Sequence, residues 1–195
     1  LTALMPLSRL LTGTAIYVRG AIVPLVFGAA PFFTRQVESA LAQMDKGLVD
    51  AILDTQDFDV AAIEHIGKSP RHFEISASEY ANPANKGALI NKLDFVVLAA
   101  LEVDTDFNVN VITGSDGVLR GAPGGHPDTA ASARCCIIVT PLTRGRMPTV
   151  CESVVTVTTP GDCVDVLVTD YGTAVNPARQ DIVECLDKAG IRHVP

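Results

Sequence analysis

The segment LDFVVLAALEV, residues Leu93–Val103, decides the fold class of this chain. It is a short apolar run bounded by polar residues, which is typical of a strand buried on both faces of a sheet. CCIIVTPL (Cys135–Leu142) and VDVLVTD (Val164–Asp170) repeat the pattern. Because strands of this kind need helices on both sides, the sequence predicts an open, largely parallel α/β sheet flanked by helices.

Helix and turn patterns lie around these strands. The apolar spacing in Gln36–Leu53 predicts one amphipathic helix, or two short helices that meet at Gly47. CESVVTVTTPGD, Cys151–Asp162, predicts a β-branched strand that ends in a Pro-Gly turn. Asn176–Gly190 is expected to form the last helix, with its first residue as the N-cap, its last as the stop, and three inward side chains: Ile182, Cys185 and Leu186.

Length and composition limit the possible functions. With 195 residues, 48% of them hydrophobic and 19% charged, the chain fits one globular domain with a substantial core. The net charge is −7 and the basic residues are scattered, so no surface is expected for nucleic acid. The uncharged stretch Gly20–Phe33 contains two prolines and is too short to span a bilayer, so no membrane span is expected.

The cysteines indicate a reducing compartment. There are five, an odd number, and no two form a C-x-x-C pair, so neither a disulfide framework nor a zinc site is expected. The sequence therefore predicts free thiols in a cytoplasmic protein that binds no metal.

The first 43 residues differ in composition from the rest. They contain no lysine and no aspartate, whereas every aspartate lies from Asp45 onward. We therefore divide the chain into an atypical segment, residues 1–43, and an α/β domain, residues 44–195. The chain also opens without an initiating Met, so we expect it to be part of a longer protein.

A glycine-rich stretch follows the first predicted strand. TGSDGVLRGAPGGHPDTA, Thr113–Ala130, lies where loops leave the carboxyl edge of a parallel sheet, the edge at which such sheets bind ligands. Glycines allow the backbone to approach a ligand and to aim N–H groups at an anion. The stretch fits neither the dinucleotide fingerprint nor the P-loop pattern, so a ligand loop and a set of plain turns both remain open.

Several motifs together resemble a known family. EISASEYANPANKGALINKLDFVVLAALEVDTDFNVNVITGSDGVLRGAPGGHPDTAASA, IIVTPLTRGRMPT and TPGDCVDVLVTDYGTAVNPAR resemble the C-terminal half of the citrate lyase alpha subunit, over Met44 to Gly190. The order E-V, N-V-N, G-G-x-x-D and I-V-T is also similar to the beta half of the CoA transferases. The resemblance implies one of the two α/β halves of the CoA-transferase-like fold.

The resemblance also implies an activity. It is the exchange of acetyl for citryl on the thioester of an acyl carrier protein, so that citrate and acetyl carrier give citryl carrier and acetate. A CoA-like phosphopantetheine-type group on the carrier, or acetyl-CoA, would supply the thioester, and no tightly bound cofactor is expected. The implied partners are citrate and the beta and gamma subunits of citrate lyase. Two alternatives remain: an acyl-carrier transferase of the malonate decarboxylase alpha type, and a non-catalytic nucleotide- or phosphate-binding module.

Site residues follow from this chemistry. Gly124 and Gly125 are candidate oxyanion donors, and His126 is a candidate hydrogen-bond partner of the substrate, with loop anchoring as its alternative. The planar fork of Arg120 suits a citrate carboxylate. Asn108 and Asn110 alternate along a strand end and are candidates to line the cleft. The candidate contacts for a CoA-like diphosphate are Gly121, Arg144 and Arg146.

Residues 1–43 depart from the resembled family. The superfamily's glutamate nucleophile would fall there, but the only glutamate is Glu38 and we assign it no role; the citrate lyase branch is thought to work without an enzyme-bound thioester. The segment is either frame-shifted or truly divergent. Because only one half of a two-half site is expected, this polypeptide alone is expected to be inactive.

Overall fold

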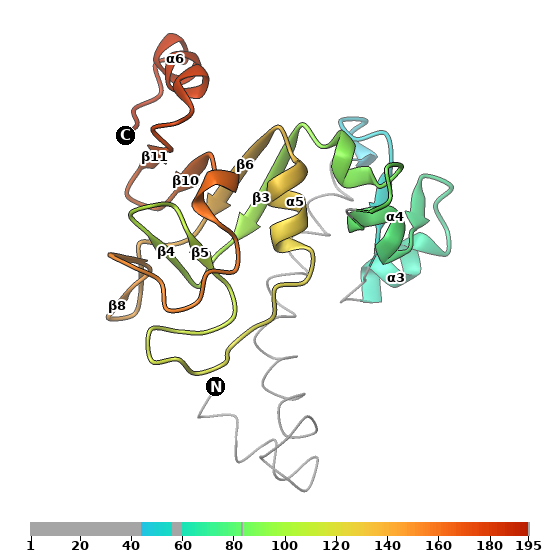
Figure 1. Cartoon of the computed structure of the whole chain (residues 1–195). Coiled ribbons are helices and arrows are strands. Elements are labelled where there is room, and N and C mark those ends of the chain that lie inside the picture. The colour runs from blue at the N-terminus through green and yellow to red at the C-terminus, as the bar shows by residue number, and fades with distance from the viewer. Residues whose placement is uncertain (1–43, 56–59, 83, 195) are drawn as a thin grey trace, which may run out of the picture. The chain divides into compact units, whose positions relative to one another are not determined.

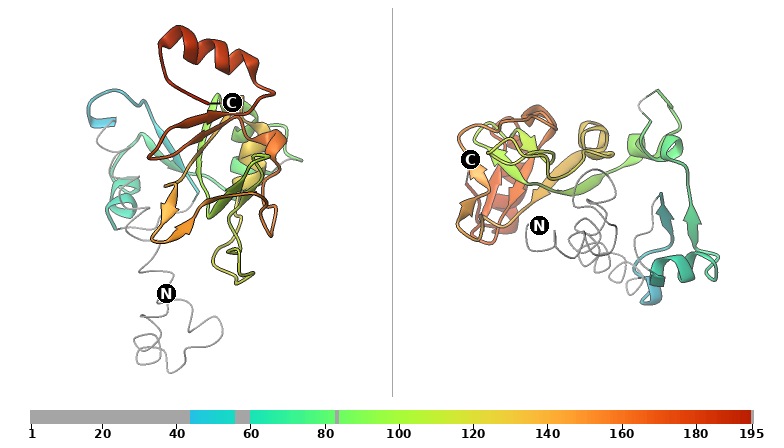
Figure 2. Two further views of the ribbon diagram at one scale, coloured as in Figure 1. Left: turned by 90° about the vertical axis from the view of Figure 1, so that its left-hand side faces the viewer. Right: turned by 90° about the horizontal axis from the view of Figure 1, so that it is seen from below.

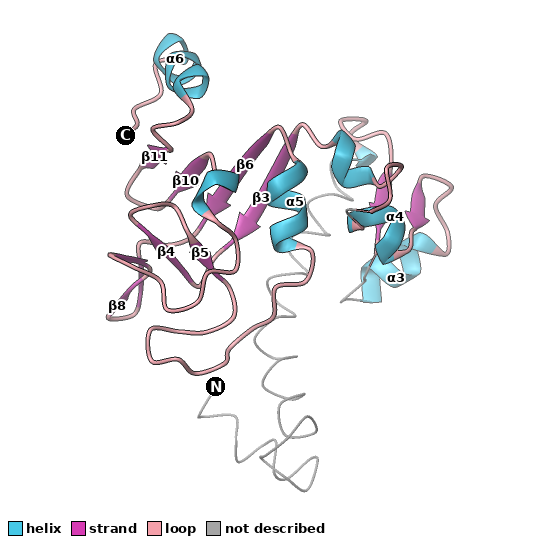
Figure 3. Cartoon of the chain, in the orientation of Figure 1, coloured by secondary structure: helices cyan, strands magenta, loops and turns pink. Residues whose placement is uncertain are grey.

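The computed structural model describes residues 44–55, 60–82 and 84–194 (Figure 1). It divides the chain into two compact units, Leu1–Ser76 and Ala77–Pro195. The described elements are short helices and strands that alternate along the chain (Figure 3).

The first unit contains a small parallel sheet. Strands β1 (Ile52–Asp54) and β2 (His72–Glu74) pair in parallel, and α3 (Val60–Ile66) lies between them in sequence. A continuous helix through Leu53 is therefore wrong. Gly47 has φ +70°, a left-handed conformation that ends a helical turn, and the chain is extended five residues later. The part of that predicted helix before residue 44 lies outside the described residues.

The second unit is built on a four-stranded sheet with the order β11-β10-β6-β3. The pairs β3–β6 and β6–β10 are parallel, and only the edge pair β10–β11 is antiparallel. The expected open, largely parallel α/β sheet is therefore confirmed. The four strands are β3 (Phe95–Ala99), β6 (Cys135–Val139), β10 (Val166–Val168) and β11 (Thr173–Val175).

One face of this sheet is covered. Helix α5 (His126–Ser132) lies across β3 and β6 (Figure 3), and its Ala130 belongs to the same buried cluster as Val96, Cys136 and Ile138. Burial in this cluster raises the pKa of the Cys136 thiol to about 12, helped by the nearby charge of Asp165, so it stays protonated. Alternate residues of each strand thus form the hydrophobic core.

Within the described part of the second unit, no helix or strand covers the opposite face of this sheet. Phe95 is 66% exposed, Val97 64% and Val139 43%. These residues alternate with the buried ones, so β3 is buried on one face only and the expectation of burial on both faces is wrong. Parallel sheets normally carry cover on both faces, which makes this apolar surface unusual.

The segment Leu93–Val103 is not one strand. It divides at Ala100 into β3 and β4 (Glu102–Asp104), because the N–H of Leu101 donates to the carbonyl of Asn110 (2.9 Å) and turns the chain away from β6. Strand β4 pairs with β5 (Val109–Asn110) and β9 (Val150–Cys151) in a second, three-stranded sheet. All three β4 residues are buried, which joins this sheet to the core.

Shorter elements complete this unit. Helix α4 (Ala77–Ala81) and the 3-10 helix η2 (Leu89–Lys92) precede β3. A hairpin of β7 (Thr143–Arg144) and β8 (Met147–Pro148) follows β6. The 3-10 helix η3 (Gly161–Cys163) begins after Pro160, as the predicted turn requires. Residues 152–158 do not form the expected strand, and the N–H of Val154 instead donates to Asp104 Oδ2 (3.3 Å).

The last helix, α6 (Gln180–Ala189), lies beyond the β11 edge of the sheet (Figures 1 and 2). It ends at Gly190, as predicted, but begins later than predicted. Asn176 does not cap it, because the Asn176 amide donates to the carbonyls of Gly161 and Val164 (3.0 and 2.8 Å). No α6 residue is buried and Cys185 is exposed, so its predicted inward position is wrong.

Two further expectations concern membranes and thiols. Within the described ranges, no helix combines the length and the apolar character that crossing a bilayer requires. All five cysteines are free thiols, as the sequence predicted.

The open sheet face predicts self-association of the chain. Sedimentation velocity over a concentration series should show larger species as concentration rises, because contact between two copies removes apolar surface from water. Val97→Lys should suppress this association, since the charge would lie at the centre of the face. Tyr171→Lys, at a residue 84% exposed in the β10–β11 turn, is the control and should associate like the unaltered chain. Monomers at every concentration would contradict the prediction.

Candidate functional site

The glycine-rich loop runs from β5 to α5 and reaches the carboxyl end of β3. His126, the first residue of α5, places its Nε2 3.0 Å from the carbonyl oxygen of Ala99, the last residue of β3. This is the edge at which open α/β sheets bind ligands. The loop therefore occupies the position that the sequence predicted for it.

The loop is folded as an internal hairpin. The N–H groups of Arg120 and Gly121 both donate to the carbonyl of Ile112 (2.7 and 3.0 Å), and the N–H of Gly114 donates to the carbonyl of Val118 (3.1 Å). Gly121 packs so closely on the Val111 carbonyl that a Cβ there would overlap it. The segment is thus a defined structure, held by its own backbone.

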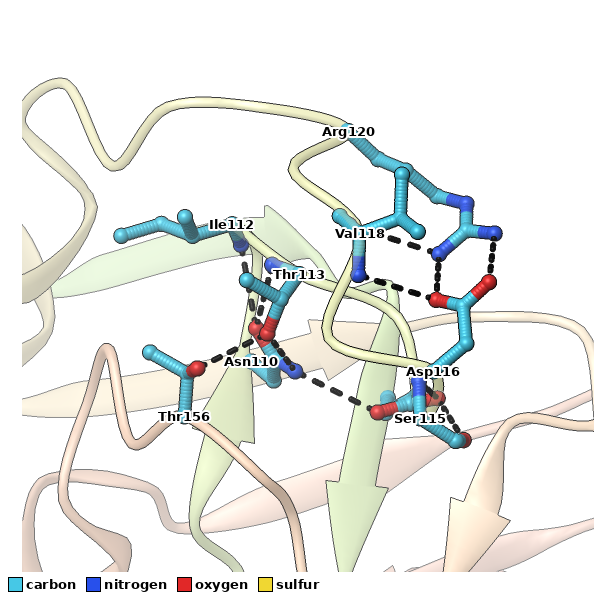
Figure 4. Close-up of polar contacts among 9 residues, drawn as sticks. Asn110, Ile112, Thr113, Ser115, Asp116, Val118, Arg120 and Thr156 are labelled. Carbon is cyan, nitrogen blue, oxygen red and sulfur yellow. Dashed lines mark hydrogen bonds and ion pairs between the residues drawn. The ribbon is translucent and has the colours of Figure 1, made fainter.

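Asn110 is the buried centre that holds the base of this hairpin (Figure 4). Its Oδ1 accepts the N–H groups of Ile112 and Thr113 (3.1 and 3.0 Å), and its Nδ2 donates to Glu102 Oε2 and Thr113 Oγ1 (3.3 and 3.2 Å). The Thr113 hydroxyl continues to Thr156 (2.8 Å). Asn110 is fully buried, so in this structure it supports the loop and does not face a cleft.

Glu102 is a buried carboxylate that sequence reasoning did not single out. Its Oε1 accepts the N–H of Ser115 (2.7 Å) and the Ser115 hydroxyl, and its Oε2 accepts the Asn110 amide. It lies within electrostatic reach of both Arg120 and Arg144. A buried charge is tolerated only when paired and hydrogen-bonded, and Glu102 has these partners.

Arg120 projects from the hairpin and forms a bidentate pair with Asp116 (Figure 4). Nη1 donates to Asp116 Oδ1 (2.5 Å) and Nη2 to Oδ2 (2.7 Å). Hydrogen bonding from Arg120 holds the pKa of the Asp116 carboxyl well below its ordinary value, and the same bond raises the pKa of Arg120. Both groups therefore stay charged at neutral pH, with the planar fork displayed at the loop surface.

Gly124 and Gly125 form the end of the loop. Gly124 has φ +52° and Gly125 has φ −85°, a left-then-right-handed pair that points successive N–H groups to one side. In the part of the chain that the structure describes, neither N–H donates a hydrogen bond. A Cβ on Gly125 would lie 3.0 Å from Tyr80 Cε1.

Tyr80 of α4 is therefore a neighbour of this turn that the sequence did not predict. Burial raises the pKa of its phenol, a hydrogen bond with Thr129 opposes the rise, and the charge of Asp128 adds to it. The phenol remains neutral near pH 7 and can donate a hydrogen bond.

His126 is buried, with a partner on each ring nitrogen. Nε2 donates to the Ala99 carbonyl, and Nδ1 lies 2.7 Å from Thr159 Oγ1. Burial lowers the pKa of the ring, and the bond to Ala99 raises it in part. The neutral ring satisfies both contacts, which favours the loop-anchoring alternative over contact with substrate.

The remaining predicted residues belong to two turns, the β4–β5 turn and the β7–β8 hairpin. Asn108 belongs to the β4–β5 turn, where its Nδ2 donates to Asp104 Oδ2 (3.1 Å) and its Oδ1 accepts the N–H of Gly161 (2.9 Å). Arg144 donates to the Ala100 carbonyl; burial lowers its pKa, and Glu102 raises it in part. Arg146 lies exposed in the β7–β8 turn.

The structure thus brings Asn110 into contact with Glu102, places Arg120 and Arg144 within electrostatic reach of that carboxylate, and puts Gly124, Gly125 and His126 at the start of α5. The sequence did not indicate Glu102 as a site residue, because its pattern is that of a strand end. It did not indicate Asp116, because that residue has the pattern of a turn. The i,i+4 spacing of Asp116 and Arg120 is the signal that could have revealed their pairing. Tyr80 carries no comparable sequence signal.

Two other possibilities for a site receive no support. Among the described residues, no three His, Cys, Asp or Glu side chains are grouped to hold a metal ion. A cavity of about 580 Å³ lies elsewhere, and none of the predicted site residues lines it; its walls include Leu142, Val150, Leu167, Tyr171, Arg192 and His193.

Fold and loop together define a class of protein. It is an α/β protein in which buried polar groups at the carboxyl edge of a parallel sheet present a shaped loop with an arginine fork. Such an arrangement suits an anionic ligand of small size.

Comparison with known proteins identifies the family. The family model described as "Citrate lyase, alpha subunit (CitF)" matches residues 31–195. The citrate lyase alpha chain of Haemophilus influenzae is 58% identical over 153 residues, which are 78% of this chain and 31% of that relative. A crystal structure of the putative alpha subunit of citrate lyase from Streptococcus mutans, in complex with citrate, has a TM-score of 0.77 at 49% identity and covers 80% of this chain and 31% of that chain. This chain therefore belongs to the citrate lyase alpha subunit family.

A second, shorter stretch of the chain is similar to a protein of a different family. The D-methionine transport system permease protein MetI of Yersinia pestis is 50% identical over 48 residues, which are 25% of this chain and 22% of that relative. The chain thus shares sequence with two kinds of protein.

The buried His126 predicts that the stability of the chain falls as pH decreases. Its pKa is lowered in the folded state, so the unfolded chain binds a proton first as pH falls through about 6.5, and the free energy of unfolding declines below that point. Urea midpoints measured from pH 7.5 to 5.5 should fall. His126→Asn should be less stable at pH 7.5 by about 1–3 kcal/mol, because Thr159 and Ala99 lose their partner, and its midpoint should depend less on pH.

Equal slopes in the unaltered chain and His126→Asn would show that this ring does not set the pH dependence.

Proposed function

We propose that this chain is the part of a citrate lyase alpha chain that holds citrate while acetyl is exchanged for citryl on an acyl carrier protein. The observation that carries the proposal is the similarity to a citrate lyase alpha subunit solved in complex with citrate, which spans 80% of this chain. The fork of Arg120 and the free N–H groups of Gly124 and Gly125 support it. On this proposal the sheet is one half of a CoA-transferase-like pair.

The proposed reaction is two successive acyl transfers. A carboxylate of citrate attacks the thioester carbonyl of the acetyl carrier; a C–O bond forms, the C–S bond breaks and the thiolate leaves. The thiolate then attacks the citryl carbonyl of the mixed anhydride, a C–S bond forms and acetate leaves with the C–O electrons. Each step passes through a tetrahedral oxyanion, which N–H donors stabilise.

Roles for this chain's residues follow from where they lie. Arg120 binds a citrate carboxylate, because its guanidinium has the geometry of a planar fork at the loop surface. Gly124 and Gly125 direct unbonded N–H groups to one side, as an oxyanion site requires. Gly121, Arg144 and Arg146 remain candidates for the diphosphate of the CoA-like arm, and both arginines are exposed. His126, Asn108 and Asn110 hold these loops in place.

The proposal includes partners and a compartment. The thioester substrate is a CoA-like phosphopantetheine-type group on the acyl carrier protein, the gamma subunit, or acetyl-CoA. The beta subunit would cleave the citryl thioester. The free cysteines support a reducing compartment, the cytoplasm.

A transferase of the malonate decarboxylase alpha type and a nucleotide-binding module are the alternatives. Binding separates them, because citrate carries three carboxylates, malonate carries two and a nucleotide carries phosphates. Isothermal titration of the 195-residue chain should show citrate binding in preference to malonate and ATP.

Arg120→Lys tests the carboxylate role directly. Lysine keeps the charge but loses the fork, so citrate affinity should fall about tenfold, the equivalent of about 1.4 kcal/mol. Lys188→Arg, on the exposed face of α6, also replaces one basic residue with the other far from the loop. This control should leave citrate affinity unchanged. Equal affinity in Arg120→Lys would remove Arg120 from the site.

The atypical segment calls for a separate proposal. We infer that the similarity to the transport permease, which spans 48 residues, takes in the start of the chain, because residues 1–43 differ in composition from the rest. On this proposal the part of the segment before residue 31, where the match to the citrate lyase alpha family begins, has a different ancestry. Amplification across the Met44 codon from source DNA should give one continuous in-frame product. A reading in which the family sequence continues upstream in another frame would contradict this.

A further inference from the structure

Arg120 has two edges that can receive a carboxylate, and the structure uses only one. The edge formed by Nη1 and Nη2 is occupied by Asp116. The other edge, formed by Nε and the second N–H of Nη2, donates to no group among the described residues. A guanidinium with one edge filled can still bind a carboxylate through the other.

The filled edge is part of a rigid clamp. Nη1 donates to Asp116 Oδ1 and to the Val118 carbonyl (2.5 and 3.4 Å), so both of its hydrogens are used. Asp116 is held independently of Arg120, because its Oδ1 also accepts the N–H of Val118 (3.1 Å; Figure 4). The Arg120 backbone is fixed in turn by its bond to Ile112. Position and direction of the open edge are therefore set before any ligand arrives.

Gly114 provides the space in which the guanidinium lies. A Cβ on Gly114 would overlap Nη1 of Arg120 and come within 2.9 Å of its Cζ. Gly114 has no left-handed φ, so the backbone there would accept an alanine. A Cβ there would also come within 3.1 Å of Asp116 Oδ1, and all of these atoms belong to the ends of side chains, which would move aside while the backbone of the hairpin remains.

We propose that Asp116 and Gly114 are positioning residues: together they fix the Arg120 guanidinium by one edge and direct its Nε edge toward a carboxylate of a small polycarboxylate ligand. This inference rests on the proposed function, in which Arg120 receives citrate. The inference adds that citrate affinity depends on the fixed orientation of the Arg120 guanidinium as well as on its charge. A side chain ordered in advance loses less conformational freedom when the ligand binds.

The sharpest test is Gly114→Ala in the 195-residue chain, because it displaces Arg120 without changing any charge. Citrate binding is measured by isothermal titration, and thermal melting checks the fold. Gly114→Ala should bind citrate about tenfold more weakly while the melting temperature stays close to that of the unaltered chain. Gly172→Ala is the matched control, because a Cβ there meets no atom within 4 Å, and it should bind like the unaltered chain.

A second measurement reports on Arg120 without any ligand. The Nε–H signal of Arg120 in a nitrogen-15 NMR spectrum should be resolved in the unaltered chain, and should shift toward random-coil values and exchange faster in Gly114→Ala. An identical Nε–H signal in the unaltered chain and in Gly114→Ala would overturn the inference, whatever citrate affinity the titration gives.

Asp116→Asn separates positioning from competition. If Asp116 positions Arg120, citrate affinity should fall although a negative charge near the ligand has been removed. Tighter binding would mean that Asp116 competes with the ligand and would overturn the inference. Asp106→Asn, an equal change of charge at the exposed β4–β5 turn, is the control.

The outcomes distinguish the two proposals. Citrate binding that is lost in Arg120→Lys but unchanged in Gly114→Ala leaves the proposed function intact and overturns the positioning role. Failure of the unaltered chain to bind citrate contradicts both.

Discussion

The hydrogen bond from buried Asn110 to buried Glu102 is the contact on which the rest of the site depends. The two residues face each other across the antiparallel pair β4–β5, and each also binds the loop that follows: Asn110 through Ile112 and Thr113, Glu102 through Ser115. Removing one partner would leave buried polar groups unsatisfied, at a cost of about 1–3 kcal/mol for each group. The backbone pairing of β4 and β5 alone would not hold the base of the loop hairpin; the side chains of Asn110 and Glu102 do so.

A second connection, through His126, sets where this loop lies against the main sheet. Its ring joins the end of β3 to Thr159, so the start of α5, the Gly124–Gly125 turn and the β5 region remain together. The polar groups between the two sheets therefore support the fold, whereas Arg120, Asp116 and the Gly124–Gly125 turn are at least partly exposed. The division explains why several residues that look suited to catalysis lie too deep to touch a substrate.

The sequence allowed much of the fold to be predicted, and the errors have physical causes. The apolar pattern found β3, β6 and β10 and their parallel pairing. It could not show that Phe95 and Val97 lie exposed, because an apolar run does not reveal whether both faces are covered. It also joined β3 to β4, since the turn at Ala100 depends on the long-range bond from Leu101 to Asn110. For the site, glycine density drew attention to the loop between β5 and α5 and to Arg120, whose binding role remains a proposal. Glu102 was not recognised because its contacts with Asn110 and Ser115 depend on the tertiary fold, and Asp116 and Gly114 were not recognised because their contacts with Arg120 depend on the conformation of the loop.

The central claim is that a preset Arg120 at the edge of the sheet receives a carboxylate of citrate. A crystal structure of this chain with citrate tests it most directly. The account predicts a citrate carboxylate within hydrogen-bonding distance of Arg120 Nε and Nη2, with the Asp116 pair still in place. Citrate bound away from Arg120 would contradict the account.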